Sequence, residues 1–329
     1  EKKVVMDELE NLDDPLKTQI ANLALPIKDD LLSGAAEIAL RAISVFQTAL
    51  NLAPADKKED APLLKSILTA TAKALIDVQP AMAPLLHLGN SVLSAIDNAT
   101  SVGEIKVKTD EALTKFEYTL CASAATIADL AYDLIDPGEL IFAYSFSSTV
   151  VSCLLNARAR GRFFRVVCTE ARPSMEGRKL ASRLASGGIE VIHTFDNAMG
   201  LVLGNCSAAF MGCDCIARPG VVNKVGSWML AVACRELKVP LYALSGTEKF
   251  IPDDRMFDFE KHERPAAEVW DNSPRGVAIL NHQFDLVPYD LLTGLVTEHG
   301  ILKESDIEPY LVNSNSTMHR ALILEASTR

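Results

Sequence analysis

The sequence changes character at an Asp-Pro-Gly turn at residues 136–138, and this change restricts the chain to a two-part architecture. Before the turn, the chain is rich in Ala and Leu, and apolar residues such as Ile38 and Phe46 recur at helical spacing. After it, short β-rich runs alternate with helical patterns. We therefore expect an all-helical domain over residues 1–134 and an α/β domain over residues 135–329.

Prolines and a charged run divide the first half into about five or six predicted helices. Pro54 and Pro62 lie on either side of the charged run 56–60, and Pro80 and Pro84 interrupt a further helical pattern. Residues 109–134 have the pattern of one long helix that ends before the turn.

The second half contains short runs that are almost entirely apolar, as is typical of central parallel strands covered on both faces. The predicted strands are residues 140–144, 163–169, 190–194, 207–211 and 240–244, with a late strand at 284–287. The predicted helices are residues 147–160, 175–186, 196–202 and 227–237, with a short one at 290–297. This order predicts a doubly wound parallel sheet with right-handed crossovers.

Charge and hydropathy exclude two classes of partner. The chain of 329 residues carries 43 acidic and 32 basic side chains, a formal net charge of −11. Direct nucleic-acid binding needs a basic surface, which an acidic chain does not favour. A membrane helix needs an unbroken apolar window, and even the apolar stretch 130–155 contains Asp133, Asp136 and Glu139. No signal peptide is visible, so we expect a soluble, cytoplasmic protein whose anionic ligands require a local basic pocket.

The cysteines favour reduced, buried thiols over disulfides or a metal site. The chain has 7 cysteines, an odd number without CxxC pairing, and most lie in apolar runs. Cys213 and Cys215 flank Asp214, but no further ligand follows at metal-binding spacing. We expect neither a metal nor a cofactor.

In an open parallel sheet, ligands bind beyond the carboxyl ends of the strands, so the residues that follow each strand are the candidates for a site. The first predicted strand is followed by Ser145 and further serines, which suit an anion or simply cap the next helix. The second is followed by Arg172 and Arg178, suited to phosphate or carboxylate. Surface ion pairs with Glu170 or Glu176 are the alternative role for these arginines.

The fourth and fifth predicted strands are followed by an acid, an amide and two lysines. Asp214, Asn223 and Lys224 lie on a glycine-containing segment before a helix, and Lys249 follows the fifth strand. Asn and Lys can hold hydroxyls or phosphate, and a partly desolvated Asp can exchange a proton. Cations at three strand ends of an acidic chain indicate a phosphate site.

Three segments make the chain recognisable: TEARP at 169–173, GCDCIARPGVVNKVGS at 212–227, and EKF at 248–250. They resemble the family of the alpha, beta and delta regulatory subunits of translation initiation factor two-B. That family also contains methylthioribose-1-phosphate isomerase and ribose-1,5-bisphosphate isomerase. The resemblance implies an N-terminal helical domain, a C-terminal Rossmann-like domain similar to ribose-5-phosphate isomerase and CoA transferases, and a homodimer built through the C-terminal domains.

The same resemblance implies roles for single residues. Asp214 falls at the catalytic aspartate of the isomerases, and Asn223, Lys224 and Lys249 fall at substrate-contacting positions. Ser145 stands where the isomerases carry a catalytic cysteine, and a serine hydroxyl without a base is too weakly acidic to replace a thiolate. Segments 32–35 and 78–80 also lack two arginines that hold phosphate in the isomerases.

These departures favour a protein that binds a phosphorylated sugar or nucleotide in the cleft between the domains without classical isomerase chemistry. One alternative is an aldose-ketose isomerase acting on a ribose 1-phosphate, with Cys168 or Cys213 supplying a thiol. Another is a regulatory subunit that binds a translation factor.

Overall fold

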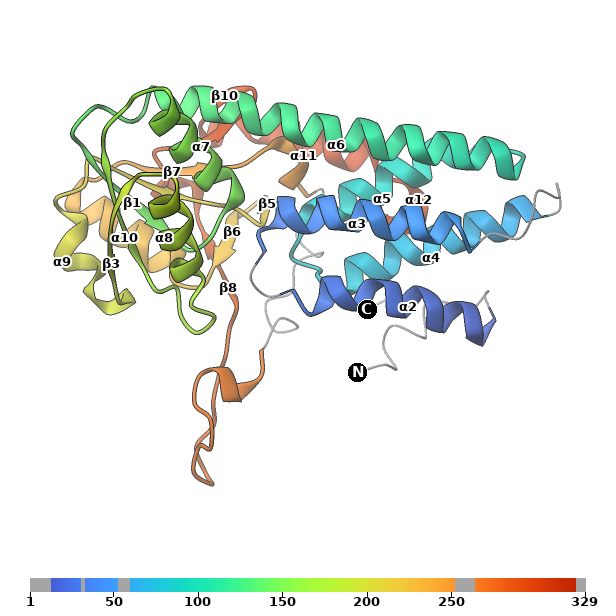
Figure 1. Ribbon diagram of the computed structural model, residues 1–329, viewed down its shortest axis with the longest axis horizontal. Coiled ribbons are helices and arrows are strands. Elements are labelled where there is room, and N and C mark those ends of the chain that lie inside the picture. The colour runs from blue at the N-terminus through green and yellow to red at the C-terminus, as the bar shows by residue number, and fades with distance from the viewer. Residues whose placement is uncertain (1–12, 31–32, 53–59, 252–263, 324–329) are drawn as a thin grey trace. The chain divides into compact units, whose positions relative to one another are not determined.

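The computed structural model describes residues 13–30, 33–52, 60–251 and 264–323 (Figure 1). The chain packs as two compact units. The helical unit contains the described residues of 1–31, 35–121 and 315–329, and the α/β unit contains those of 32–34 and 122–314. The predicted helix break at residues 54–59 lies outside the described residues.

The helical unit is built from amphipathic helices that bury Ala, Leu and Ile side chains. They are α2 (Asp14–Lys28), α3 (Ala35–Leu50), α4 (Ala61–Val78), α5 (Ala83–Ile96) and α6 (Val102–Tyr132), with α12 (Arg320–Ile323) from the far end of the chain. α6 begins earlier than the predicted residue 109 because the side chains of Ser101 and Glu104 cap its first turn. The Ser101 hydroxyl accepts from the Glu104 amide at 3.2 Å, and the Glu104 carboxylate accepts from the Thr100 amide at 2.9 Å. In the described ranges, no helix is long and apolar enough to cross a membrane.

A doubly wound sheet forms the centre of the α/β unit, as the sequence predicts. Its strand order is β10-β9-β7-β4-β1-β2-β3, and every neighbouring pair is parallel except β10 with β9. The strands are β1 (Leu140–Tyr144), β2 (Arg165–Thr169), β3 (Glu190–Thr194), β4 (Ala208–Met211), β7 (Leu241–Leu244), β9 (Gly294–Thr297) and β10 (Gly300–Leu302).

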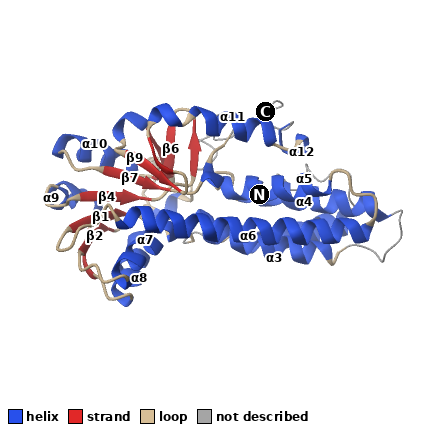
Figure 2. Ribbon diagram, turned by 90° about the horizontal axis from the view of Figure 1, so that it is seen from above, coloured by secondary structure: helices blue, strands red, loops and turns tan. Residues whose placement is uncertain are grey.

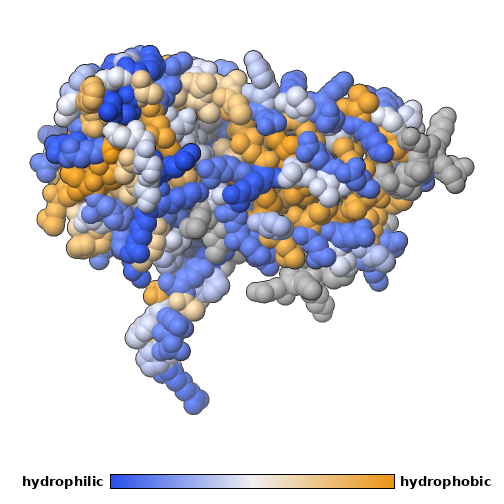
Figure 3. Space-filling model, viewed as in Figure 1, coloured by the Kyte–Doolittle hydropathy of each residue, from blue (hydrophilic) through white to orange (hydrophobic). Residues whose placement is uncertain are grey.

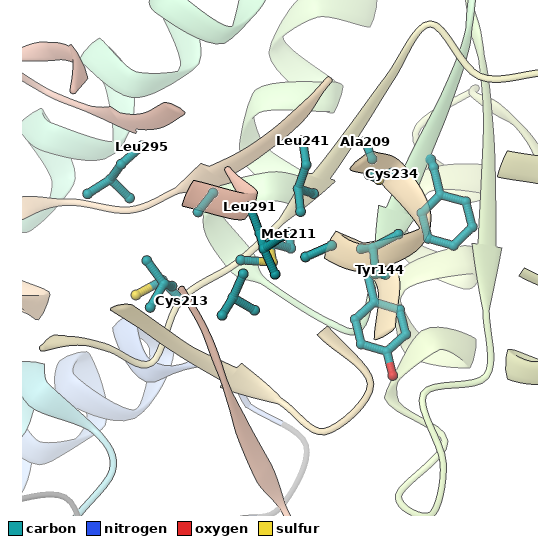
Figure 4. Packing of buried hydrophobic residues seen from close by; sticks show 14 of the residues in the cluster. Tyr144, Ala209, Met211, Cys213, Cys234, Leu241, Leu291 and Leu295 are labelled. Carbon is teal, nitrogen blue, oxygen red and sulfur yellow. The ribbon is translucent and has the colours of Figure 1, made fainter. Parts of the chain in front are cut away.

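Helices cover both faces of this sheet (Figure 2). Ile141 and Ala143 of β1 join a core with the end of α6, α7 (Ser148–Ala159) and α8 (Glu176–Ser186). Phe142 and Tyr144 point to the opposite face, where they join α9 (Met199–Leu203), α10 (Ser227–Leu237) and the cluster drawn in Figure 4. Successive side chains along a strand point to opposite faces, and both faces of this sheet are covered by helices. For this reason β1 and its neighbours are built from runs without polar residues.

The predicted helix at residues 290–297 is wrong. The structure has a short 3₁₀ turn, η7 (Tyr289–Leu291), followed by strand β9, which pairs in parallel with β7. A short apolar run cannot be assigned to helix or strand by its periodicity. Gly294, which disfavours a helix, fits the strand because a Cβ there would lie 2.5 Å from Ile301 Cγ2.

A second, antiparallel sheet contains β5 (Cys215–Ala217), β6 (Gly220–Lys224) and β8 (Phe284–Val287), in the order β5-β6-β8. The sequence predicts β8 but not the β5–β6 hairpin, because residues 212–227 look like one glycine-containing loop. Arg218 and Pro219 form the turn of the hairpin, and Gly220 begins β6 with φ +154°, where a Cβ would lie 2.3 Å from the Val287 carbonyl oxygen. The loop that follows β4 is therefore a rigid element.

Candidate functional site

The candidate site lies where the winding of the main sheet reverses direction. From β1 the chain moves outward to β2 and then β3, and it returns to add β4 on the other side of β1. In doubly wound sheets the carboxyl ends of two such strands form the usual ligand site. Ser145 follows β1 directly, and Asp214 follows β4 after two residues.

Ser145, Glu176 and Lys224 meet at this position. The Ser145 hydroxyl donates to Glu176 Oε2 at 2.7 Å, and Lys224 Nζ lies 2.9 Å from Glu176 Oε1. The Lys224 and Glu176 side chains are only 5% and 12% exposed. Ser145 has a left-handed backbone with φ 60°, so the chain leaves β1 through a sharp turn that turns its hydroxyl toward α8.

Asp214 and Lys249 complete what we call the charged cluster: Ser145, Glu176, Asp214, Lys224 and Lys249. Desolvation raises the pKa of Asp214 to about 6, while Lys249 and Lys224 oppose the shift and Glu176 adds to it. In the described part of the chain, the Asp214 carboxylate accepts no hydrogen bond. The buried Lys249 Nζ donates to the Cys213 carbonyl at 2.5 Å.

Hydrogen bonds around the start of α10 fix the position of Lys224. The Asn223 amide donates to the Ser227 hydroxyl at 2.8 Å, and that hydroxyl donates to the Lys224 carbonyl at 2.7 Å. The Tyr144 hydroxyl donates to the Val225 carbonyl at 2.6 Å. Gly226, at φ 101°, is required because a Cβ there would lie 2.0 Å from that hydroxyl. Lys224 is thus held by β1, β6 and α10 together.

Asp285 of β8 caps α10 from the side. Its Oδ2 accepts from the amides of Gly226 at 2.8 Å and Trp228 at 3.2 Å, while its buried Oδ1 has no hydrogen-bond partner among the residues that the structure describes. Burial raises the pKa of Asp285 to about 6, and the two amide bonds oppose that shift. No local sequence pattern marks Asp285 as a site residue, because it reaches α10 only through the pairing of β8 with β6.

The two arginines of the predicted site are placed differently from the lysines. Arg178 pairs with Glu170 at 2.7 Å, with the arginine side chain 61% exposed. Arg172 is exposed, and the carboxylate of Asp196 holds its backbone amide at 2.9 Å. The structure thus gathers Ser145, Asp214, Lys224 and Lys249, turns Asn223 toward Ser227, and leaves Arg172 and Arg178 at the surface.

From the sequence, Glu176 is expected only as an ion-pair partner for an arginine. In the structure its partners are Lys224 and two serines, since Ser174 Oγ also donates to Glu176 Oε1 at 2.9 Å. Its position at the start of α8, on the segment that follows the carboxyl end of β2, is a usable signal in the sequence.

Burial keeps the nearby thiols protonated. It raises the pKa of Cys213 and of Cys168 to about 12, and both side chains lie in the core. Neither is a ready nucleophile or base near neutral pH. Across the described residues, no three His, Cys, Asp or Glu side chains gather as metal ligands do.

We expect Asp214→Asn to stabilise the protein more at about pH 7.5 than at about pH 4.5. The folded-state pKa of Asp214 lies above its ordinary value of 3.8, so the folded protein holds the Asp214 proton more tightly than the unfolded chain does. This preference stabilises the folded state fully below pH 3.8, and the stabilisation is lost as the pH rises through about 6. The neutral variant escapes this loss, which is at most roughly 2 to 3 kcal/mol. Thermal unfolding of both proteins at the two pH values measures it. An equal difference at both values would show that Asp214 titrates normally.

Comparisons with known proteins agree with this architecture. The profile of the Initiation factor 2 subunit family matches residues 31–304. A Pyrococcus abyssi protein named as eIF-2B subunit 2-like is 32% identical over 288 residues, covering 87% of this chain and 97% of that protein. The ribose 1,5-bisphosphate isomerase of Pyrococcus furiosus is 25% identical, covering 86% and 90%.

Solved structures give the same result. The crystal structure of Pyrococcus horikoshii OT3 translation initiation factor eIF-2B superposes with a TM-score of 0.72 at 30% identity, covering 89% of this chain and 98% of that one. The 5-methylthioribose 1-phosphate isomerase of the same organism shares the fold, with a TM-score of 0.71 at 22% identity over 90% and 86% of the two chains. The chain therefore belongs to the Initiation factor 2 subunit family.

Proposed function

We propose that the α/β unit binds a phosphorylated small molecule, a sugar phosphate or a nucleotide, at the charged cluster, without converting it as an isomerase does. The observation that carries this proposal is the burial of two ammonium groups, Lys224 and Lys249, at the carboxyl edge of the sheet. Burying a charge is costly, and such groups are found where a ligand needs them. The names of the isomerase relatives make a phosphorylated sugar the first class to test.

We expect no isomerisation because the groups that would have to transfer protons are not suited to it. Aldose-ketose isomerisation needs a base within reach of the carbon-bound proton and an acid at the oxygen. Asp214, with its pKa near 6, suits one of these roles. At the family's cysteine position stands Ser145, whose hydroxyl is already bound to Glu176, and Cys168 and Cys213 stay protonated.

We expect Lys224→Ala to weaken the binding of a ribose phosphate by about 1.5 to 3 kcal/mol, the usual loss for a hydrogen bond to a charged group. Calorimetric titration measures the change. Lys238→Ala, at an exposed lysine after α10, is the matched control and should bind as the wild type does. Unchanged affinity in a folded Lys224→Ala protein would mean that Lys224 does not contact the ligand.

We expect neither methylthioribose 1-phosphate nor ribose 1,5-bisphosphate to yield a ketose with the wild-type protein. Ser145→Cys should restore little, because a thiolate at that position would face the Glu176 carboxylate. NMR of the incubated sugars follows the reaction. Turnover in the ordinary range of ~1 to 10³ per second, abolished by Asp214→Asn, would identify an isomerase instead.

A regulatory role beside a translation initiation factor is the second candidate. The sequence identities favour it. The chain is 32% identical to the protein named eIF-2B subunit 2-like and 25% identical to a ribose 1,5-bisphosphate isomerase that covers a similar share of the chain. This role and ligand binding are compatible, and the NMR measurement separates both from the isomerase.

We also propose that the chain forms a homodimer through the α/β unit. Residues 284–287 of the largely apolar stretch 279–287 pair with β6 inside the chain as β8, so a self-contact needs another surface. Exposed apolar side chains remain on α9 and α10: Leu201 at 82%, Met229 at 63% and Trp228 at 46% exposure. Figure 3 shows apolar residues gathering on the flank of the α/β unit where these helices lie. A monomer seldom leaves such a patch uncovered.

Light scattering at micromolar concentration should give a dimer, with an interface of about 2,000 Å² or more. Met229→Glu should shift the population toward monomer, because it places a charge in the apolar patch. Val107→Glu, at an exposed valine of α6 in the helical unit, is the control and should leave the dimer intact. A monomeric wild type would refute the dimer.

A further inference from the structure

Glu176 already occupies a set of donors of the kind that binds an anion. Its carboxylate accepts from the hydroxyls of Ser145 at 2.7 Å and Ser174 at 2.9 Å and pairs with the ammonium of Lys224 at 2.9 Å. Two hydroxyls and a buried ammonium are equally suited to the oxygens of a phosphate. Glu176 and an incoming anion therefore compete for the same three groups.

The charges of the cluster reinforce this competition. Two ammonium groups, Lys224 and Lys249, stand against the carboxyl groups of Glu176 and Asp214, and the Glu248 carboxyl also interacts with Lys249. The site therefore carries no excess positive charge when these carboxyls are ionised. Lys249 is engaged with the Cys213 carbonyl. A phosphate thus gains little net attraction while the Glu176 charge remains on Lys224.

The backbone fixes Glu176 in this place. The carboxylate of Asp196 accepts from the amides of Ala171 and Arg172 at 2.8 and 2.9 Å and holds the preceding loop. Gly177 packs so closely that a Cβ on it would lie 1.7 Å from the Thr169 carbonyl oxygen. Glu176 can release Lys224 only by turning its own side chain.

We infer that Glu176 is an internal counter-ion of the ligand site, which holds Lys224 and Ser145 in the absence of ligand and sets the affinity for phosphate. The inference rests on the proposed function and adds a specificity-determining residue to it. Glu176 lowers the affinity of the site for inorganic phosphate. A phosphorylated ligand displaces the carboxylate only if its sugar or base makes further contacts with the protein.

The test is calorimetric titration of inorganic phosphate into the wild type and Glu176→Gln at constant pH. The variant keeps the shape but removes the charge, so it should bind phosphate at least about tenfold more tightly, the equivalent of one strong charge-assisted contact. Glu170→Gln removes a nearby carboxylate that pairs with Arg178 outside the cluster and should stay within about twofold of the wild type.

Glu176→Ala provides a second variant in case Glu176→Gln does not fold. It removes the carboxylate and leaves Ser145, Ser174 and Lys224 free to bind phosphate, so it should also tighten phosphate binding by about tenfold or more. Equal or weaker phosphate binding in the folded variant overturns the inference. If the wild type binds a ribose phosphate and Glu176→Gln gains nothing, the inference alone fails. If the wild type binds no ribose phosphate while Glu176→Gln binds inorganic phosphate more tightly, the proposed function fails alone.

Discussion

The pairing of β1 with both β2 and β4 is the constraint on which the rest of the α/β unit depends. Because β1 lies at the reversal of the winding, the segments that leave β1, β2 and β4 all leave the sheet at one edge. For this reason Ser145, Glu176 and Asp214 lie at the same edge of the sheet. The side-chain alternation of β1 also assigns the helices to the two faces, so one short strand organises both cores and the site.

Burying the charged cluster costs free energy that its own contacts do not fully offset. Asp214 lacks hydrogen-bond donors among the described residues and has a raised pKa, and two ammonium groups are withdrawn from water beside it. A protein in which well-packed apolar side chains replace buried charges is often as stable as the original or more stable. A contribution to stability therefore does not explain why this cluster is present. Groups whose pKa is perturbed by burial and by nearby charges cluster at functional sites.

The sequence predicts the elements whose patterns are local and unambiguous. The bounds of β1, β3, β8 and α10 are found to the residue. β1, for example, begins just after the Asp-Pro-Gly turn at 136–138, which limits what the following apolar run can be. The helix expected at 290–297 and the missed β5–β6 hairpin have short patterns that several structures satisfy. The partner of Glu176 depends on which strand ends meet, and that is a property of the sheet order rather than of neighbouring residues.

The residues at positions 145 and 176 constrain each other. The Ser145 hydroxyl gives its proton to a hydrogen bond with Glu176 and needs no ionisation to do so. A group at 145 that had to ionise would stand within hydrogen-bond distance of a carboxylate, and the repulsion would raise its pKa. A serine is therefore compatible with a charged glutamate at 176, and a working thiolate is not. Replacing the serine without the glutamate would leave that conflict in place, so the chemistry of this site is decided by the pair and not by either residue.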